Sequence, residues 1–256
     1  NTTGSYNVGI GNYALFNNTT AGSNVAVGDE AMFSNLSGSN NTAIGGAALR
    51  ANTTGGENSA FGYLALKSNT TGTRNTALGL STLFNNLEGT TNIAIGREAL
   101  YNNTTGSYNT AYGFTALKCN TTGERNSAFG RTTLRANTTG SFNNAFGMYA
   151  LELNTTGSCN TAVGYFSLYA NTGGCRNTAS GNSSMQGNTT GWENTASGFY
   201  SLRCNTTGCH NTVLGSCAMY ASVTGIYNTA LGHSALKCNT TANKNTALGV
   251  CALFSN

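Results

Sequence analysis

Asn103–Cys119 reads NTTGSYNTAYGFTALKC, and this stretch of seventeen residues is repeated along the whole chain. Its leading tetrapeptide, Asn103–Gly106, recurs as Asn120–Gly123 and as Asn137–Gly140, each time seventeen residues later. Fifteen such repeats and one trailing residue, Asn256, account for all 256 residues without an insertion. A fixed period of this size predicts a repeat architecture, because one short unit cannot bury its own apolar face and must stack on copies of itself.

We number each repeat from its leading asparagine, as N-T-T-G-x-x-N-T-A-x-G-x-x-A-L-x-x, and call each repeat a rung. Position 7 is Asn and position 11 is Gly in every rung, position 15 is always Leu or Met, and position 14 is always small. This regularity indicates that a given position meets the same neighbours in every rung. We predict one uninterrupted repeat domain over residues 1–256, belonging to a longer chain or filament, with rungs starting at residues 1, 18, 35, 52, 69, 86, 103, 120, 137, 154, 171, 188, 205, 222 and 239.

The repeat favours strands over helices. Two glycines per rung would each cost a helix about 1 kcal/mol, and no apolar stripe of helical spacing is present. Positions 7–11, such as NTAIG at residues 41–45, instead alternate between small and larger apolar residues, which is typical of a strand. We therefore predict an all-β fold, a parallel β-solenoid (β-roll) of fifteen 17-residue rungs. Short strands are expected at positions 7–11 and 14–16, a turn at N-T-T-G, and an interior made of positions 9, 11 and 15.

The asparagines at position 7 have a separate physical reason to recur. An Asn side chain offers an acceptor oxygen and two donor hydrogens, so identical residues one rung apart can bond in a continuous ladder. We predict a structural Asn ladder made of Asn7, Asn24, Asn41, Asn58, Asn75, Asn92, Asn109, Asn126, Asn143, Asn160, Asn177, Asn194, Asn211, Asn228 and Asn245.

Two segments carry a resemblance to known repeats. Ser23–Met32, SNVAVGDEAM, and Asn40–Leu49, NNTAIGGAAL, resemble the head repeats of trimeric autotransporter adhesins, which fold as a left-handed parallel β-roll. The longer unit NTAxGxxALxxNTTG is similar to repeats of phage tail fibres and bacterial surface proteins. The resemblance covers the whole chain and implies side-by-side association, such as a trimer. The rigid seventeen-residue period departs from the adhesin pattern, so the alternative is that one chain closes its own core.

The composition argues against catalysis and against nucleic-acid binding. Charged residues make up 8% of the chain, the net charge is +4, and the basic residues are scattered rather than gathered in a patch. Asp29 is the only Asp, His210 and His233 are the only histidines, and no catalytic or metal-ligand motif occurs. We expect no enzyme activity, no cofactor and no metal. No apolar run is long enough to span a membrane, and no signal peptide is visible.

Eight cysteines begin at Cys119, and they favour an oxidising compartment if they pair. Cys159 and Cys175 occupy neighbouring turn positions in adjacent rungs, and Cys204 and Cys209 bracket one turn. Both pairs are predicted to lie within disulfide reach, with free cysteines as the alternative.

The leading asparagine of twelve rungs begins an Asn-x-Thr/Ser sequon, so a secreted chain could carry a row of glycans along the N-T-T-G turns. The alternative is that Asn, Thr and Gly simply make a good turn. The Thr residues at positions 2 and 3 could also form an ice-binding array, although they lie at a turn. The candidate glycosylation sites are Asn1, Asn18, Asn35, Asn52, Asn69, Asn103, Asn120, Asn137, Asn154, Asn188, Asn205 and Asn239.

Aromatic residues gather at positions 12, 13 and 16, and position 16 also holds basic residues. A stripe of this kind favours an interface with a sister chain, and glycan contact is the second interpretation. The residues concerned are Tyr63, Phe114, Tyr165, Phe199 and Tyr200.

Two hypotheses of function follow from these patterns. The first is a non-catalytic, extracellular or cell-surface fibre or filament, including a virion fibre, whose copies associate end to end or side by side. The second is a glycan- or receptor-binding fibre module. An ice-binding solenoid is a third, weaker alternative.

Overall fold

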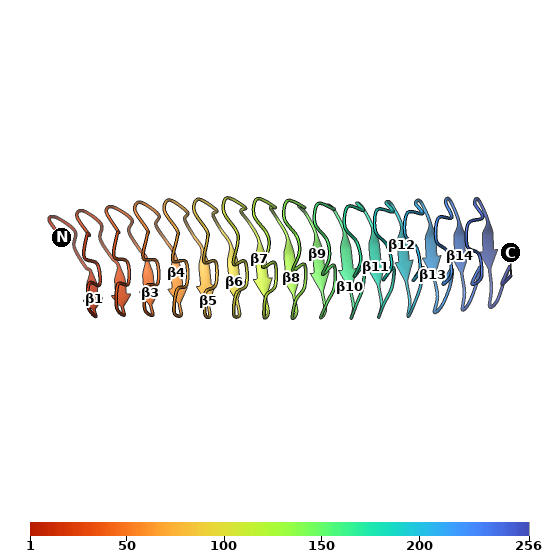
Figure 1. Ribbon diagram of the computed structural model, residues 1–256, viewed down its shortest axis with the longest axis horizontal. Helices are drawn as coiled ribbons and strands as arrows, with labels where there is room; N and C mark the ends of the chain where they lie inside the picture. The colour runs from red at the N-terminus through yellow and green to blue at the C-terminus, as the bar shows by residue number, and fades with distance from the viewer. Residues whose placement is uncertain (256) are drawn as a thin grey trace. The chain divides into compact units, whose positions relative to one another are not determined.

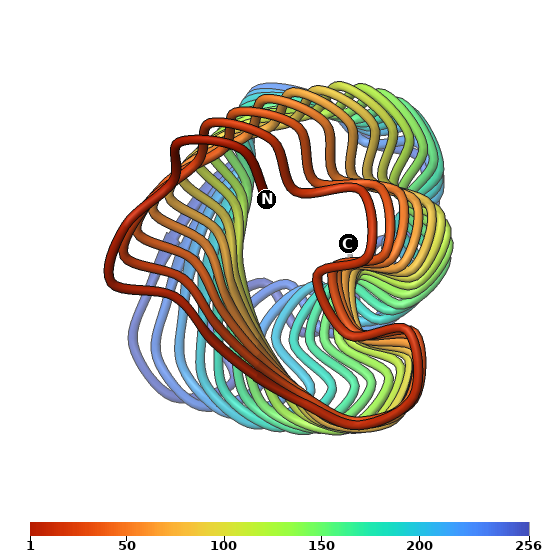
Figure 2. The ribbon, with the colours of Figure 1, turned by 90° about the vertical axis from the view of Figure 1, so that its left-hand side faces the viewer.

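A computed structural model of the chain describes residues 1–255. The chain divides into two compact units, Asn1–Asn126 and Ser127–Asn256, and each is built of 17-residue rungs with one short strand per rung (Figure 1). The end-on view shows the rungs within each unit following the same path (Figure 2). The fold is an all-β parallel β-solenoid, so the predicted fold class is confirmed.

In the first unit, each strand pairs in parallel with the strand of the next rung, and the register is shifted by one whole repeat, as in Val8 opposite Val25. Because the register is in phase with the sequence period, each position faces its own copy. The strands are β1 (Val8–Ile10), β2 (Val25–Val27), β3 (Thr42–Ile44), β4 (Ser59–Phe61), β5 (Thr76–Leu78), β6 (Ile93–Ile95) and β7 (Thr110–Tyr112).

The second unit repeats this arrangement, as in Thr161 opposite Thr178. Its strands are β8 (Ser127–Phe129), β9 (Asn144–Phe146), β10 (Thr161–Val163), β11 (Thr178–Ser180), β12 (Thr195–Ser197), β13 (Thr212–Leu214), β14 (Thr229–Leu231) and β15 (Thr246–Leu248).

The strand occupies positions 8–10 and is shorter than the predicted 7–11. Position 11 ends it, because the glycines there have φ between 119° and 140°, outside the extended range. At Gly28, φ is 135° and an added Cβ would lie 2.6 Å from the carbonyl oxygen of Gly45 in the next rung. Only glycine fits this bend, which explains its presence in every rung.

The second strand, predicted at positions 14–16, is not formed. Positions 12–17 make consecutive turns, and positions 13 and 15 are left-handed, as at Thr115 (φ 53°) and Leu117 (φ 51°). Hydrogen bonds still join the rungs here, since the Leu49 amide donates to Ala65 O at 3.0 Å and the Ala51 amide to Lys67 O at 2.9 Å. Because left-handed residues alternate with other residues here, the amide and carbonyl groups point along the stack although the chain is not extended.

Left-handed residues other than glycine recur at positions 6, 13 and 15 of every rung. Such a conformation costs an ordinary residue about 1–2 kcal/mol, and it persists only where the surroundings over-determine it. The bonds between rungs provide that determination. At position 6, for example, the Thr91 amide donates to Thr73 O of the preceding rung at 2.9 Å.

The interior has an apolar side and a polar side. The apolar side is made of positions 9, 14 and 15, as at Ala43, Ala48 and Leu49, all with 0% exposure. Position 14 therefore takes the place predicted for position 11, whose glycines are half-buried at the bend. The polar side is made of the asparagines of positions 1 and 7, which are buried throughout both units except at terminal rungs.

Candidate functional sites: asparagine ladders, aromatic clusters and a groove

The position 7 asparagines form a continuous ladder within each unit, but its bonds differ from those predicted. The Asn24 Oδ1 accepts the backbone N–H of Asn41 at 2.9 Å, and the Asn41 Nδ2 donates to Gly55 O of the next rung at 2.9 Å. Direct bonds between the amide side chains are longer, as between Asn75 Nδ2 and Asn58 Oδ1 at 3.1 Å. This ladder therefore ties side chains chiefly to backbone.

A second ladder, at position 1, is the amide-to-amide chain. The Asn52 Nδ2 donates to Asn35 Oδ1 of the preceding rung at 2.8 Å and to Gly55 O of its own rung at 2.8 Å. The carbonyl oxygen of Gly55 thus accepts one hydrogen bond from each ladder, and these two bonds use both of its lone pairs. The sequence carried one signal for this ladder, because Asn86 and Asn171 are kept at position 1 in rungs that have no sequon.

Burial of the position 1 asparagines argues against the predicted glycosylation at interior rungs. A glycan is attached to the asparagine side-chain nitrogen, and that atom is the buried donor of the ladder. Of the twelve sequon asparagines, Asn1 is exposed and the other eleven are at most 2% exposed. Attachment at any of these eleven would displace a ladder bond and require the rung to open.

The position 1 ladder has a defect where Ser222 replaces asparagine. The serine is too short to reach the preceding rung, and both the Oδ1 of Asn205 and the Oγ of Ser222 are buried without a hydrogen-bond partner. In the rung before, the corresponding bond from Asn205 Nδ2 to Asn188 Oδ1 measures 2.7 Å. The defect is a local weakness in the position 1 ladder.

The predicted disulfides are not present, because Cys159, Cys175, Cys204 and Cys209 are all free. The Cys175 thiol turns toward its own turn, donating to Gly173 O at 3.3 Å and accepting the Ser158 amide at 3.3 Å. Burial, with the Glu193 charge as a smaller cause, raises the pKa of the Cys209 thiol. The cysteines therefore fill positions used by serine in other rungs.

The predicted aromatic surface breaks up into local clusters. The rings of Tyr165 and Phe166 meet edge to face at 4.3 Å, and those of Phe199 and Tyr200 lie 3.8 Å apart. Of the five predicted residues, Tyr63, Phe114, Tyr165 and Phe199 are between 42% and 59% exposed, and Tyr200 is half-buried.

The basic and aromatic residues of position 16 are engaged with one another. Lys67 Nζ lies 5.0 Å from the Phe84 ring centroid, Phe84 stacks on Tyr101 at 4.9 Å, and Lys118 Nζ lies 5.8 Å from the Tyr101 ring. These cation–π and stacking contacts join consecutive rungs. The threonines of position 2 are likewise used internally, since Thr53 Oγ1 donates to Thr70 O at 3.0 Å, which removes this hydroxyl from an ice-binding array.

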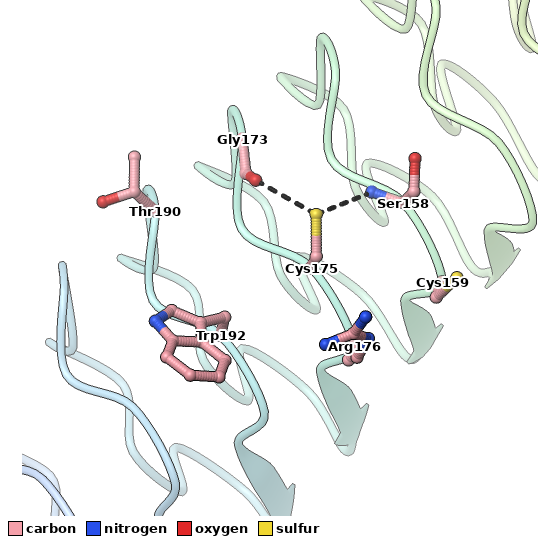
Figure 3. A pocket seen from close by; sticks show the side chains of 7 residues that line it. All are labelled: Ser158, Cys159, Gly173, Cys175, Arg176, Thr190 and Trp192. Atoms are coloured by element: carbon pink, nitrogen blue, oxygen red, sulfur yellow. Dashed lines mark hydrogen bonds between the residues drawn. The ribbon is translucent and has the colours of Figure 1, made fainter.

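A group of polar and aromatic side chains lies on the turn edge of the second unit, around an open groove of about 390 Å³ (Figure 3). Three successive rungs contribute to it, and Trp192 forms one wall (Figure 3). The lining residues are Ser158, Cys159, Gly173, Cys175, Arg176, Thr190 and Trp192. Of these, the sequence had singled out only the two cysteines, and for another reason.

Charged groups beside the groove are paired along position 6. Arg176 Nη1 lies 3.0 Å from Glu193 Oε1, and Glu193 Oε2 lies 3.2 Å from His210 Nδ1. The His210 ring contacts the Trp192 ring edge to face at 4.3 Å and stacks on Tyr227 at 4.6 Å. The cluster holds Trp192 in place and neutralises the guanidinium locally.

Over residues 1–255, no group of three His, Cys, Asp or Glu side chains is arranged to hold a metal ion. Within the same range, no helix has the length and apolar character needed to cross a bilayer. Comparison with protein-family models, with curated proteins and with solved structures gives no match.

Proposed function

We propose that the chain is a non-catalytic structural solenoid whose copies associate side by side in an extracellular fibre. The observation that carries the proposal is the outward face of the strands at position 10. Ile44 on β3, Phe61 on β4 and Leu78 on β5 are exposed by 40%, 37% and 47%. Exposed contiguous apolar surface of this kind marks an interaction site in soluble proteins.

The occupant that fits this face best is a second copy of the chain. Parallel strands in phase place the position 10 side chains in a row with a spacing of about 4.8 Å. A second copy carries the same row at the same spacing, so its side chains can lie between those of the first along the whole contact. A partner without this period would match the row at one or two points only.

The non-catalytic part of the proposal is supported by how the chain uses its ionisable groups. Glu30 and Arg50 pair at 2.6 Å, and Glu98 and Lys118 pair at 2.7 Å, each pair joining one rung to the next. The Arg50 hydrogen bond lowers the pKa of the Glu30 carboxyl, and the Lys118 hydrogen bond does the same for Glu98. Both carboxylates are held ionised as parts of the stack, which is a structural use.

The test is sedimentation velocity of the intact protein over a range of concentrations. A Phe61→Ser/Leu78→Ser double variant interrupts the apolar row in the first unit, and the fold accepts serine there because Ser180 and Ser197 occupy the same position. Leu36→Thr is the matched control, since Leu36 is 43% exposed but lies at position 2.

We expect the wild type and the control to associate equally and the double variant to need a higher concentration to form the same oligomer. A wild type that sediments as a monomer at every concentration contradicts the proposal, as does a double variant that associates as strongly as the wild type. Electron micrographs of the intact protein test the fibre itself, and discrete short particles would count against it.

A further inference from the structure

Two departures from the repeat meet at the groove of Figure 3. Trp192 is the only tryptophan of the chain and stands at position 5, where Ser, Gly, Thr and Cys predominate. Gly173 stands at position 3 of the preceding rung, where most rungs carry threonine. Stacking requires neither residue, because the other rungs form the same turn without them.

The missing side chain of Gly173 creates the space beside which Trp192 lies. A Cβ added at Gly173 would meet one atom, Thr156 Oγ1 at 3.6 Å, so the missing side chain leaves room on the surface and relieves no clash. The indole is 42% exposed beside this space. A bulky aromatic wall next to a missing side chain is the arrangement of a binding groove, and about 390 Å³ is within the range of small-molecule sites.

We propose that this groove binds a neutral saccharide of one or two rings. The indole supplies a flat apolar surface for the C–H face of a sugar ring. Hydroxyl partners are close: Thr190 is exposed at the groove, and Arg176 spends Nη1 on Glu193 and keeps further N–H donors. One aromatic wall with a few polar groups is the chemistry by which a polyhydroxylated ring is held.

The charges beside the groove favour a neutral ligand over a nucleotide or another anion. The Arg176 guanidinium is compensated by Glu193 at 3.0 Å, and the same carboxylate contacts His210 at 3.2 Å. Phosphate recognition relies on cationic groups aimed at the phosphate, and this cation is already paired. A sugar hydroxyl needs only the hydrogen-bond donors that remain.

The site is independent of the proposed self-association. It lies at positions 3, 5 and 6 on the turn edge, whereas the apolar row lies at position 10 on the strands. A copy bound through the strands leaves the turn edge open, so saccharide binding and oligomerisation can fail separately.

The single tryptophan provides the assay. Fluorescence of the intact protein is titrated with neutral mono- and disaccharides, including glucose, galactose, N-acetylglucosamine, maltose, cellobiose and lactose, and with adenosine monophosphate. We expect a saturable change in Trp192 emission with at least one sugar, at a Kd in the millimolar range, and no tighter response to the nucleotide.

Gly173→Thr restores the residue of the other rungs, keeps the reporter and fills the groove, so it should weaken binding at least tenfold without lowering the temperature of thermal unfolding. Arg176→Gln should weaken binding severalfold. Arg74→Gln is the matched control, because Arg74 pairs with Glu57 at 3.0 Å at the same position but away from the groove.

Absence of saturable binding by every sugar tested would overturn the proposal. So would sugar binding that Gly173→Thr leaves unchanged, or a nucleotide that binds more tightly than any sugar. Calorimetry with Trp192→Ser, which places the commonest residue of position 5 there, provides a second readout, and full retention of the binding heat would also contradict it.

Discussion

Replacing Ser222 with asparagine should stabilise the second unit. The new Nδ2 would donate to Asn205 Oδ1 and to Gly225 O, and the new Oδ1 would accept from Asn239 Nδ2, as the other rungs of the position 1 ladder do. In the rung before, these donor bonds measure 2.7 Å to Asn188 Oδ1 and 2.9 Å to Gly208 O. The substitution therefore gives Asn205 Oδ1 a hydrogen-bond donor and eliminates the unpartnered Ser222 Oγ.

The magnitude follows from the cost of those orphaned groups. A buried polar group without a partner costs about 1–3 kcal/mol, and two such groups set the upper limit of the gain. Ordering the longer asparagine side chain and fitting its extra volume offset part of it. We expect a net gain of about 1–3 kcal/mol in the free energy of unfolding, or roughly 2–4 °C in Tm per kcal/mol for a chain of this size.

Guanidinium unfolding, combined with hydrogen exchange at the amides of residues 222–239, measures this gain where it arises. Asn188→Ser is the matched reverse change in the same ladder, and it should lower stability and accelerate exchange one to two rungs away. If Ser222→Asn leaves both stability and exchange unchanged while Asn188→Ser is also silent, these side-chain bonds contribute nothing net and the ladder argument is wrong.

Further substitutions test the backbone and the ion pairs. Gly9→Ala should gain about 0.5–1 kcal/mol, because alanine fills this strand position in most other rungs and the nearest atom to an added Cβ is 3.5 Å away. Gly28→Ala should lose more than about 2 kcal/mol, since φ is 135° and the Cβ would strike the next rung; equal melting curves for the two variants would refute the reasoning. Thr91→Asn, at an exposed left-handed residue with φ 56°, should gain up to about 1 kcal/mol over Thr91→Val, and no difference would show that the conformation carries no strain. The Lys118 hydrogen bond lowers the pKa of Glu98 from its ordinary 4.5, so this stabilisation is present above pH 4.5 and is lost as pH falls through the lower folded value. Stability measured from pH 7 to 3 should therefore fall more steeply in the wild type than in Lys118→Gln, and parallel profiles would exclude this pair as a source.

The architecture is predictable from the repeat, because strict repetition leaves few possible folds. A seventeen-residue period without insertions requires each position to face its own copy, and the in-phase register of Val8 with Val25 follows from that. The strand, the buried alanine of position 9 and the buried leucine of position 15 follow from the alternation of small and large residues. The outward apolar row at position 10 is the other face of the same alternation.

The contacts between neighbouring rungs, by contrast, become visible in the folded chain and not in the repeat. Local preference could not show that Asn35 points inward as a ladder donor and not outward as a glycan site, because the sequon Asn35-Leu36-Ser37 is compatible with both orientations. Nor could it show that positions 14–16 bond between rungs through left-handed residues such as Leu117, since propensity favours no such conformation. The groove at Trp192 likewise depends on Gly173 lying opposite it one rung away. The physical reason is common to all three: side-chain direction and contact between rungs are set by backbone torsions and by atoms seventeen residues distant, which local sequence preference does not contain.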